Sequence, residues 1–307
     1  MKRLAPIAML LAICGAARVA GARQEMPPVL SARTDLVTLA VTVVDRHGAR
    51  VGGLRAEHFT VYDGGETRAI QFFSSGGLPA TVGLLIDCSG SMRGHQRPII
   101  AAASAFTVMG DEGDEFFTLN FNDVVWPGLP PPVAFTRNRE LLQAALAATP
   151  AQGMTALYDA VDRGLSQLEG GSRDRRALII VSDGGDNASA RTRSDVLAHA
   201  RRASAVIYSV SILDPDNREG RADVLKTLAR ETGGRAHTAS GGEDVDRAFD
   251  DIAAEIRSGY TIGFVPVQAA NAGFRPIRVV VDTGDRRRLT ARTRAGYYAE
   301  PPAAPSP

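Results

Sequence analysis

Lysine is almost absent from this chain. Of its 35 basic residues only Lys2 and Lys226 are lysines, and all the others are arginines. A phosphate-binding loop needs a lysine directly after a glycine-rich turn, and neither lysine has that setting. The sequence therefore argues against nucleotide hydrolysis of the P-loop type, and we expect no nucleotide partner.

Cysteine is equally scarce, with Cys14 near the start of the chain and Cys88 in its interior. If the N-terminal segment is removed on export, Cys88 is the only thiol, and an internal disulfide is excluded. Cys88 follows an apolar run, so we expect a small buried side chain there. His95 is near in sequence, but nothing fixes a Cys–His pair, so a nucleophilic role is not predicted.

The chain also lacks an apolar run of the ~20 residues that a membrane-spanning helix needs. The N-terminal stretch 4–17 is apolar but is interrupted by Pro6 and Gly15. Basic residues precede this stretch, and the Ala-Gly-Ala sequence 20–22 follows it. This arrangement is typical of a secretory signal peptide over residues 1–22, so we expect export to the periplasm or the cell exterior.

A lipid anchor is the alternative to a freely exported protein. Residues 11–14, Leu-Ala-Ile-Cys, resemble a bacterial lipobox, which would place the lipid on Cys14. The bulky Ile13 directly before the cysteine fits that motif poorly, so cleavage after Ala22 is favoured. At the other end, the proline-rich tail 300–307 is expected to be disordered.

The charge balance gives no basis for nucleic-acid binding. The chain has 35 basic and 34 acidic residues, and removal of Lys2, Arg3 and Arg18 with the signal peptide leaves 32 basic residues and a net charge of −2. Nucleic-acid-binding domains usually carry a clear basic excess. With 44% hydrophobic and 22% charged residues, the composition is that of a globular protein.

Strand and helix patterns alternate through residues 79–258. The expected strands cover 81–87, 115–123, 176–184, 205–213 and 235–240. The expected helices cover 98–110, 138–148, 155–170, 192–204, 222–234 and 244–259. Strands that alternate with amphipathic helices predict the α/β class, here a doubly wound and mainly parallel sheet covered on both faces.

Two β segments flank this α/β domain, at 33–76 and 259–299. The first contains expected strands at 37–45, 59–63 and 66–73, with a hairpin at Gly64-Gly65; the second contains expected strands at 260–267, 276–284 and 287–298. Each segment alone has too few strands for a stable core. We therefore expect the two segments to pair into one small β-sandwich, into which the α/β domain is inserted.

Three separated segments supply oxygen atoms at strand or helix ends. Asp87, Ser89 and Ser91 follow an apolar strand, Thr155 follows a glycine at a helix start, and Asp183 ends another strand. In a parallel sheet, such ends meet at one edge and form the binding site. Two carboxylates and three hydroxyls suit a hard divalent cation, Mg²⁺ or Mn²⁺, with waters completing the coordination.

Simpler explanations exist for each of these residues alone. Ser89 and Ser91 are also typical helix caps, and Asp183 before a glycine is also typical of a plain turn. Five suitable residues in order on the expected elements favour the metal site. Asp186 and Asn187 follow directly, and the sequence leaves open whether they hold a metal-bound water or cap the loop.

This pattern resembles the metal-ion-dependent adhesion site of the von Willebrand factor type A (vWA) domain, a Rossmann-like fold, over residues 79–258. The resemblance implies an intact ligand set of Asp87, Ser89, Ser91, Thr155 and Asp183, with the hydroxyls bound directly and the carboxylates directly or through water. The flanking β segments, with Gly-Tyr-Tyr at 296–298, resemble a bacterial secreted family described as VWFA-related.

The implied function is a non-enzymatic, metal-dependent protein-binding or adhesion module, in which the cation takes a carboxylate from a protein partner. A metal-assisted hydrolase is the first alternative, with Asp186 as the only evident base. A structural envelope module is the second. The five scattered histidines form no H-E-x-x-H motif, and no G-x-S-x-G motif occurs. The sequence does not decide the partner, the oligomeric state or whether the helix at about 245–258 shifts on binding.

Overall fold

The fold is known from a computed structural model, which describes residues 36–146, 150–213, 223–267, 273–285 and 287–299. Its described strands form one six-stranded sheet and two four-stranded sheets. The six-stranded sheet carries helices on both faces, and the two smaller sheets are antiparallel. This confirms the predicted fold class.

The six-stranded sheet has the order β10-β9-β8-β5-β6-β7. Its strands are β5 (Ala80–Asp87), β6 (Glu115–Phe121), β7 (Val125–Pro127), β8 (Arg175–Ser182), β9 (Val206–Ile212) and β10 (Ala236–Ala239). All pairings are parallel except that of β6 with β7. Every residue of β5 and β6 is buried, as their continuous apolar character predicts. The sequence pattern missed β7, because an edge strand of three residues that ends in proline carries no alternation.

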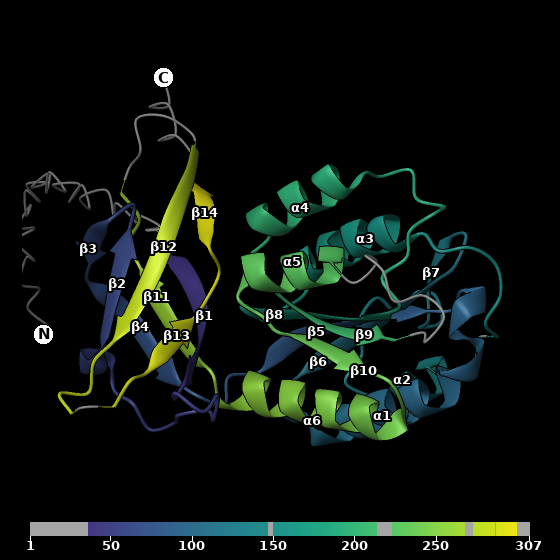
Figure 1. Ribbon diagram of the computed structural model, residues 1–307, viewed down its shortest axis with the longest axis horizontal. Coiled ribbons are helices and arrows are strands. Elements are labelled where there is room, and N and C mark those ends of the chain that lie inside the picture. Colours follow the sequence, from purple (N-terminus) through teal and green to yellow (C-terminus); the bar gives the residue numbers. More distant parts are fainter. Residues whose placement is uncertain (1–35, 147–149, 214–222, 268–272, 286, 300–307) are drawn as a thin grey trace, which may run out of the picture. The chain divides into compact units, whose positions relative to one another are not determined.

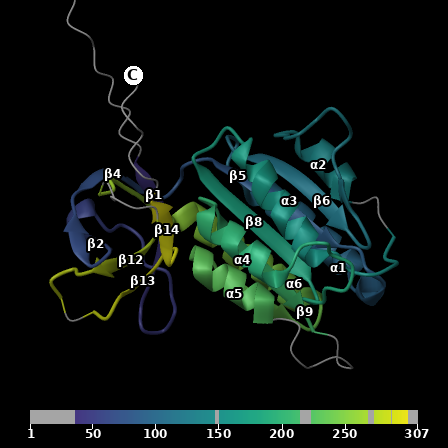
Figure 2. The same cartoon turned by 90° about the horizontal axis from the view of Figure 1, so that it is seen from above.

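Six helices of the described chain cover this sheet: α1 (Gln96–Met109), α2 (Arg139–Leu146), α3 (Leu157–Glu169), α4 (Arg193–Arg202), α5 (Asp223–Thr232) and α6 (Gly242–Ser258). Figure 1 shows α3, α4 and α5 on one face and α1, α2 and α6 on the other. Figure 2 shows α3, α4 and α5 side by side along their face. In α3 the buried side chains recur at helical spacing, and Gly164 lets the helix approach Leu85 and Leu178 of the sheet.

The two antiparallel sheets combine the two ends of the described chain. One has the order β13-β1-β11-β4 and the other β14-β12-β2-β3. The strands are β1 (Val37–Val44), β2 (Phe59–Asp63), β3 (Glu66–Arg68), β4 (Ile70–Ser75), β11 (Tyr260–Phe264), β12 (Gly273–Val281), β13 (Thr290–Arg292) and β14 (Gly296–Ala299). β1 pairs with β11, and β2 pairs with β12. The expected pairing of the N- and C-terminal segments is therefore confirmed, and both sheets contribute to one buried cluster that includes Leu39, Val61 and Tyr260.

Two expected single strands were wrong. The stretch 66–73 divides at Ala69 into β3 and β4, and the stretch 287–298 divides into β13 and β14. In each case the two pieces belong to different sheets. Alternation of apolar and polar residues marks a strand but does not say which sheet it joins, so a crossing between sheets leaves no signal. The expected hairpin at Gly64-Gly65 is confirmed, with φ of +60° and +92°.

Arginines bind the carboxyl ends of several helices. Arg175 donates to the carbonyl oxygen of Ile256 in α6 over 2.6 Å, and Arg294 donates to that of Arg201 in α4 over 2.8 Å. Arg292 donates over 3.0 Å to the carbonyl oxygen of Gly233, directly after α5. These carbonyls have no partner within their helices, and the cation also faces the negative end of the helix dipole. The planar guanidinium reaches several acceptors at once, which explains the use of arginine rather than lysine.

Two expectations, the signal peptide 1–22 and the tail 300–307, lie outside the described residues. Among the helices that the structure does describe, none has the length and apolar character needed to cross a membrane.

Candidate functional site

The first two of the predicted loops are joined through their backbones. The loop after β5 carries Ser89 and Ser91, and the loop before α3 carries Thr155. Gly90 N–H donates to the carbonyl oxygen of Gly153 over 3.0 Å, and Gln152 N–H donates to that of Cys88 over 2.9 Å. These bonds hold the loop of Thr155 against the loop of the two serines at the carboxyl end of β5.

The loop after β8 is joined to the second loop through Asn187 and Asp186. Thr155 N–H donates to Oδ1 of Asn187 over 2.8 Å, and Asn187 N–H donates back to the carbonyl oxygen of Thr155 over 2.9 Å. Oδ1 of Asp186 accepts from Tyr158 N–H over 3.1 Å, in the first turn of α3. Both side chains therefore brace the loops, which is one of the two roles that the sequence left open; the other role, holding a metal-bound water, stays a prediction.

Asp87 is completely buried at the end of β5. Its Oδ2 accepts a hydrogen bond from Ser182 Oγ over 2.6 Å, and its Oδ1 accepts from Ser89 N–H over 2.8 Å. Burial raises the pKa of the Asp87 carboxyl, and the nearby charge of Asp183 adds to this effect. The hydrogen bonds from Ser182 and Ser89 lower the pKa, and the net value is about 6. Among the described residues no cationic side chain pairs with Asp87 or Asp183.

The hydroxyls of Ser89 and Ser91 lie beside each other, with their Oγ atoms 3.1 Å apart. Ser89 precedes a 3₁₀ turn, η2 (Gly90–Gly94), but its side chain makes no capping hydrogen bond there. Ser89 is buried and Ser91 is exposed, so the pair extends from the interior to the surface. The helix-cap explanation therefore does not account for these hydroxyls.

The remaining two predicted residues lie in the loops already described. Thr155 is buried, two residues before α3 begins. Asp183 is partly buried, and its Oδ1 accepts from Gly185 N–H over 2.8 Å in a turn where Gly184 has a φ of +84°. The structure thus brings all five predicted residues to three connected loops at one edge of the sheet.

Ser182 is a residue of the candidate site to which the sequence analysis gave no role. Its Oγ donates to Asp87 and also accepts from Gly184 N–H over 3.0 Å, so it fixes both the carboxylate and the third loop. The only available signal was its position as the last residue of a strand directly before Asp183. That position alone does not distinguish a positioning residue from a buried strand residue.

Cys88 lies next to Asp87 but has no chemical role in this arrangement. Its side chain is 2% exposed, and its thiol donates to the carbonyl oxygen of Ile86 over 3.6 Å. Burial raises the pKa of the Cys88 thiol to about 12, and the charge of Asp87 contributes to the rise. A thiol of this kind is neither a nucleophile nor a metal ligand at neutral pH, in agreement with the predicted small buried side chain.

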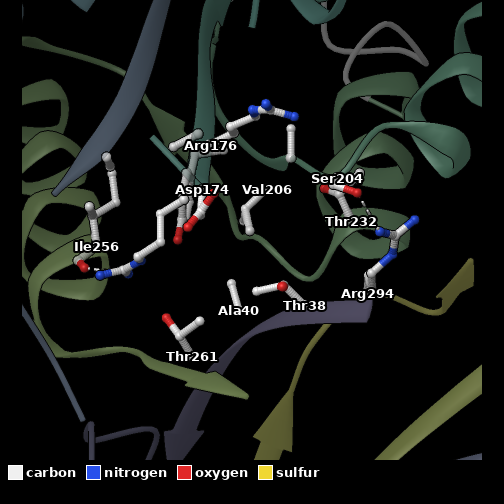
Figure 3. Close-up of a pocket in the computed structure, with 15 residues that line it drawn as sticks. Thr38, Ala40, Asp174, Arg176, Ser204, Val206, Thr232, Ile256, Thr261 and Arg294 are labelled. Atoms are coloured by element: carbon white, nitrogen blue, oxygen red, sulfur yellow. Dashed lines mark hydrogen bonds between the residues drawn. The ribbon is translucent and has the colours of Figure 1, made fainter. Parts of the chain in front are cut away.

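A separate cavity lies at the other edge of the six-stranded sheet. It has an empty volume of about 630 Å³, including the part that opens to solvent, and it is lined from the start of β8 and β9, from β1 and from β11. Figure 3 shows Asp174 and Val206 facing Thr38, Ala40 and Thr261 across it. None of the five predicted ligand residues lines this cavity.

A mainly parallel open sheet with helices on both faces, and with loops gathered at its carboxyl edge, defines a doubly wound α/β domain. The family model described as the von Willebrand factor type A domain matches residues 80–238, which is 159 of the 307 residues. The chain therefore belongs to this family. Comparison with curated proteins gives no match.

Several solved structures share the fold. The von Willebrand factor type A protein from Catenulispora acidiphila is 12% identical, with a TM-score of 0.51, over 87% of this chain and 74% of that chain. The vWF domain of the type V pili tip protein Mfa5 from Porphyromonas gingivalis is 14% identical, with a TM-score of 0.50, over 60% of this chain and 96% of that chain. Proximal thread matrix protein 1 from the mussel byssus is 13% identical, with a TM-score of 0.50, over 61% of this chain and 48% of that chain.

Proposed function

We propose that this protein is a metal-dependent protein-binding module of the cell envelope or exterior. A divalent cation held by Asp87, Ser89, Ser91, Thr155 and Asp183 would take a carboxylate from a protein partner. The observation that supports the proposal is the buried carboxylate of Asp87. It lies near Asp183 and the paired hydroxyls of Ser89 and Ser91, and it has no cationic partner among the described residues.

The residues fit Mg²⁺ or Mn²⁺ better than a softer metal. The described residues contain no group of three or more histidine, cysteine, aspartate or glutamate side chains suited to a metal ion. The predicted ligands are instead two carboxylates and three hydroxyls, which are hard oxygen donors. A bound cation of this kind supplies positive charge and an open coordination position for an incoming carboxylate.

The family and its structural relatives support the binding role. vWA domains generally mediate protein–protein interactions, and one of the similar structures comes from a pilus tip protein. The N-terminal sequence 1–22 supports an exported location, where such a module would meet partners outside the cytoplasm. The Gly-Tyr-Tyr at 296–298 supports membership of the secreted VWFA-related group.

We favour binding over metal-assisted hydrolysis because one oxygen of the candidate base Asp186 already serves to hold the loops. Oδ1 of Asp186 accepts from both Tyr158 N–H and Ser189 Oγ, the latter over 2.6 Å. A general base must be free to accept a proton from a water beside the metal. Asp186 instead anchors the third loop to α3, so we propose no catalytic role for it.

Calorimetric titration of the purified protein with Mg²⁺ and with Mn²⁺ tests the metal site. We expect binding to the unmodified protein and none to the Asp87→Ala variant, with the native circular dichroism spectrum retained in both. Asp250→Ala is the matched control, because Asp250 is exposed on α6 away from the three loops. Unchanged metal binding by Asp87→Ala would contradict the proposed site.

Capture of proteins from an extract of the source cells tests the partner. The protein is immobilised with Mg²⁺, with a chelator, and as the Asp87→Ala variant. A partner retained only with Mg²⁺ and an intact Asp87 would support the proposal. Equal retention in all three cases would move the binding function to another surface.

A further inference from the structure

Two large apolar side chains are exposed on the loops around the proposed metal site. Met154 is 50% exposed in the loop that carries Thr155, and Val124 is 63% exposed in the turn between β6 and β7. Exposed apolar side chains gathered at a candidate site mark a surface for a partner. A single exposed apolar side chain far from a site does not indicate a partner surface. What matters is therefore where Met154 and Val124 lie relative to the candidate site.

Hydrogen bonds join the loop that carries Met154 to the turn that carries Val124. Ala156 N–H donates to the carbonyl oxygen of Asn122 over 2.6 Å, which joins the loop of Met154 to the β6–β7 turn. Gly153 packs so closely on Asp123 in that turn that a Cβ atom would lie 2.0 Å from its Oδ2. The loop of Met154 is thus bonded to the β6–β7 turn and, through Gly153, to the loop of Ser89 and Ser91.

The other side of the site is polar and hollow. A depression with an empty volume of about 620 Å³, including the part that opens to solvent, is lined by Thr155 together with Tyr158, Gly184, Gly185, Asp186, Asn187, Arg193 and Val224. Most of these residues follow β8, which lies on the opposite side of β5 from β6. Thr155 therefore lies between the apolar side chains of Met154 and Val124 and the polar hollow. The proposed cation, which Thr155 would help to hold, would lie between this apolar flank and the hollow.

From this asymmetry we infer that the partner presents an acidic residue with a large apolar residue on one side and a polar residue on the other. The inference rests on the proposed function, because the acidic residue is the one that the cation would take. The apolar residue packs on Met154 and Val124, where the flexible thioether adapts to different shapes. The polar residue enters the hollow and meets the phenol of Tyr158 and the guanidinium of Arg193.

A displayed peptide library tests the inference. Its members carry one fixed aspartate with three randomised positions on each side, and they are selected on the purified protein with Mg²⁺ and released with a chelator. We expect enrichment of a large apolar residue on one side of the aspartate and of a polar residue on the other. Replacement of the apolar residue by glycine in a synthetic peptide should weaken binding about 5- to 20-fold.

Variants of the protein separate this inference from the proposed function. Met154→Ala should weaken binding of the selected peptide by a similar factor. It should leave the Mg²⁺ affinity measured by calorimetry unchanged. Val108→Ala is the control, because Val108 is 51% exposed at the end of α1, away from the three loops, and should change neither quantity.

Three outcomes would overturn the inference. Peptides that bind through Mg²⁺ and aspartate without a flanking preference would refute it and leave the proposed function standing. The same follows if Met154→Ala has no effect on peptide binding, or if it lowers Mg²⁺ affinity as much as peptide affinity. If no peptide is enriched in a Mg²⁺-dependent way, the proposed function itself fails. It also fails if replacement of the fixed aspartate of the peptide by asparagine leaves the binding affinity unchanged.

Discussion

Ser182 donates a hydrogen bond from its Oγ to Oδ2 of Asp87 over 2.6 Å, across the ends of the neighbouring strands β8 and β5. This bond holds a fully buried carboxylate in one orientation and ties the first loop of the site to the third. It stabilises the ionised carboxylate only in part, since burial still raises the Asp87 pKa to about 6. Ionisation of Asp87 therefore remains costly in the metal-free protein.

Asp87→Asn should stabilise the metal-free protein at pH 7. The pKa of about 6, against an ordinary 3.8, means that keeping Asp87 ionised costs stability. At ~1.4 kcal/mol for each pKa unit, the variant should gain about 1–3 kcal/mol in free energy of unfolding. Urea unfolding in the presence of a chelator measures this. With Mg²⁺ the order should reverse, because only the unmodified protein gains stability from the cation.

The contribution of Asp87 to the stability of the metal-free protein should decrease as the pH rises. Between about pH 3.8 and pH 6 the folded protein keeps the Asp87 proton that the unfolded chain has already lost. The contribution of this group to stability therefore falls as pH rises through that window. Unfolding free energies measured with a chelator at pH 4.5 and pH 7 should show the fall, and Asp87→Asn should remove this component. An unchanged pH profile in the variant would contradict the prediction.

Ser182→Ala should weaken metal binding about 3- to 10-fold without preventing folding, since it removes one hydrogen bond to a charged group. The same change also frees Gly184 N–H and loosens the third loop. Calorimetric titration with Mg²⁺ measures the loss. Ser211→Ala is the matched control, because Ser211 is the buried neighbour of Ser182 on β9 and its Oγ has no partner within the described chain. An equal effect of both variants would indicate a general packing loss.

Arg175→Met should destabilise the fold by about 2–4 kcal/mol, because it leaves two partly buried carbonyl oxygens without their donor. Arg175 donates to Ile256 over 2.6 Å and to Leu78 over 3.2 Å. Guanidinium chloride unfolding measures the change. Arg176→Met is the control and should cost less than about 1 kcal/mol, since its bond to Glu169 is long, at 3.5 Å, and exposed. A similar loss in the two variants would show that the carboxyl end of α6 does not need Arg175.

Cys88 should resist alkylation in the folded protein. Its thiol is buried and has a pKa of about 12, so almost no thiolate is present at pH 8. Iodoacetamide treatment followed by peptide mass spectrometry should leave Cys88 unmodified in native protein and modified in urea. Rapid native labelling would show that the loop after β5 opens easily, contrary to its backbone bonds with Phe121 and Gln152.

The α/β core was predictable because its signals are local. The strands 81–87 and 176–184 are continuous apolar runs, and the helix 155–170 has apolar residues at helical spacing, so each element can be recognised alone. The edge strand β7 and the two strands that cross between sheets were missed. Their assignment depends on hydrogen bonds to distant segments, which no local pattern records.

The residues of the candidate site were likewise predictable from the sequence only in part. Asp87, Ser89, Ser91, Thr155 and Asp183 were predictable, because each is a chemically suitable residue at the end of a predicted element. Ser182 and the bracing roles of Asp186 and Asn187 were not, because they depend on which oxygen faces which N–H after the loops have met. Whether a metal is bound remains a prediction that the titrations above decide.

The sequence by itself determined the fold class, the family resemblance and the identity of the five oxygen-bearing residues. Hydrophobic periodicity and strand-end chemistry are properties of the chain alone. Only the tertiary structure decided that Asp87 is fully buried beside Ser182, that the loops carrying Met154 and Val124 are bonded together, and that a polar hollow opens beside Thr155. Burial, pKa and surface asymmetry come from the approach of segments up to about one hundred residues apart, such as Asp87 and Ser182 with a separation of 95. The physical reason is that solvent exclusion and hydrogen-bond partners are set by neighbours in space rather than in sequence.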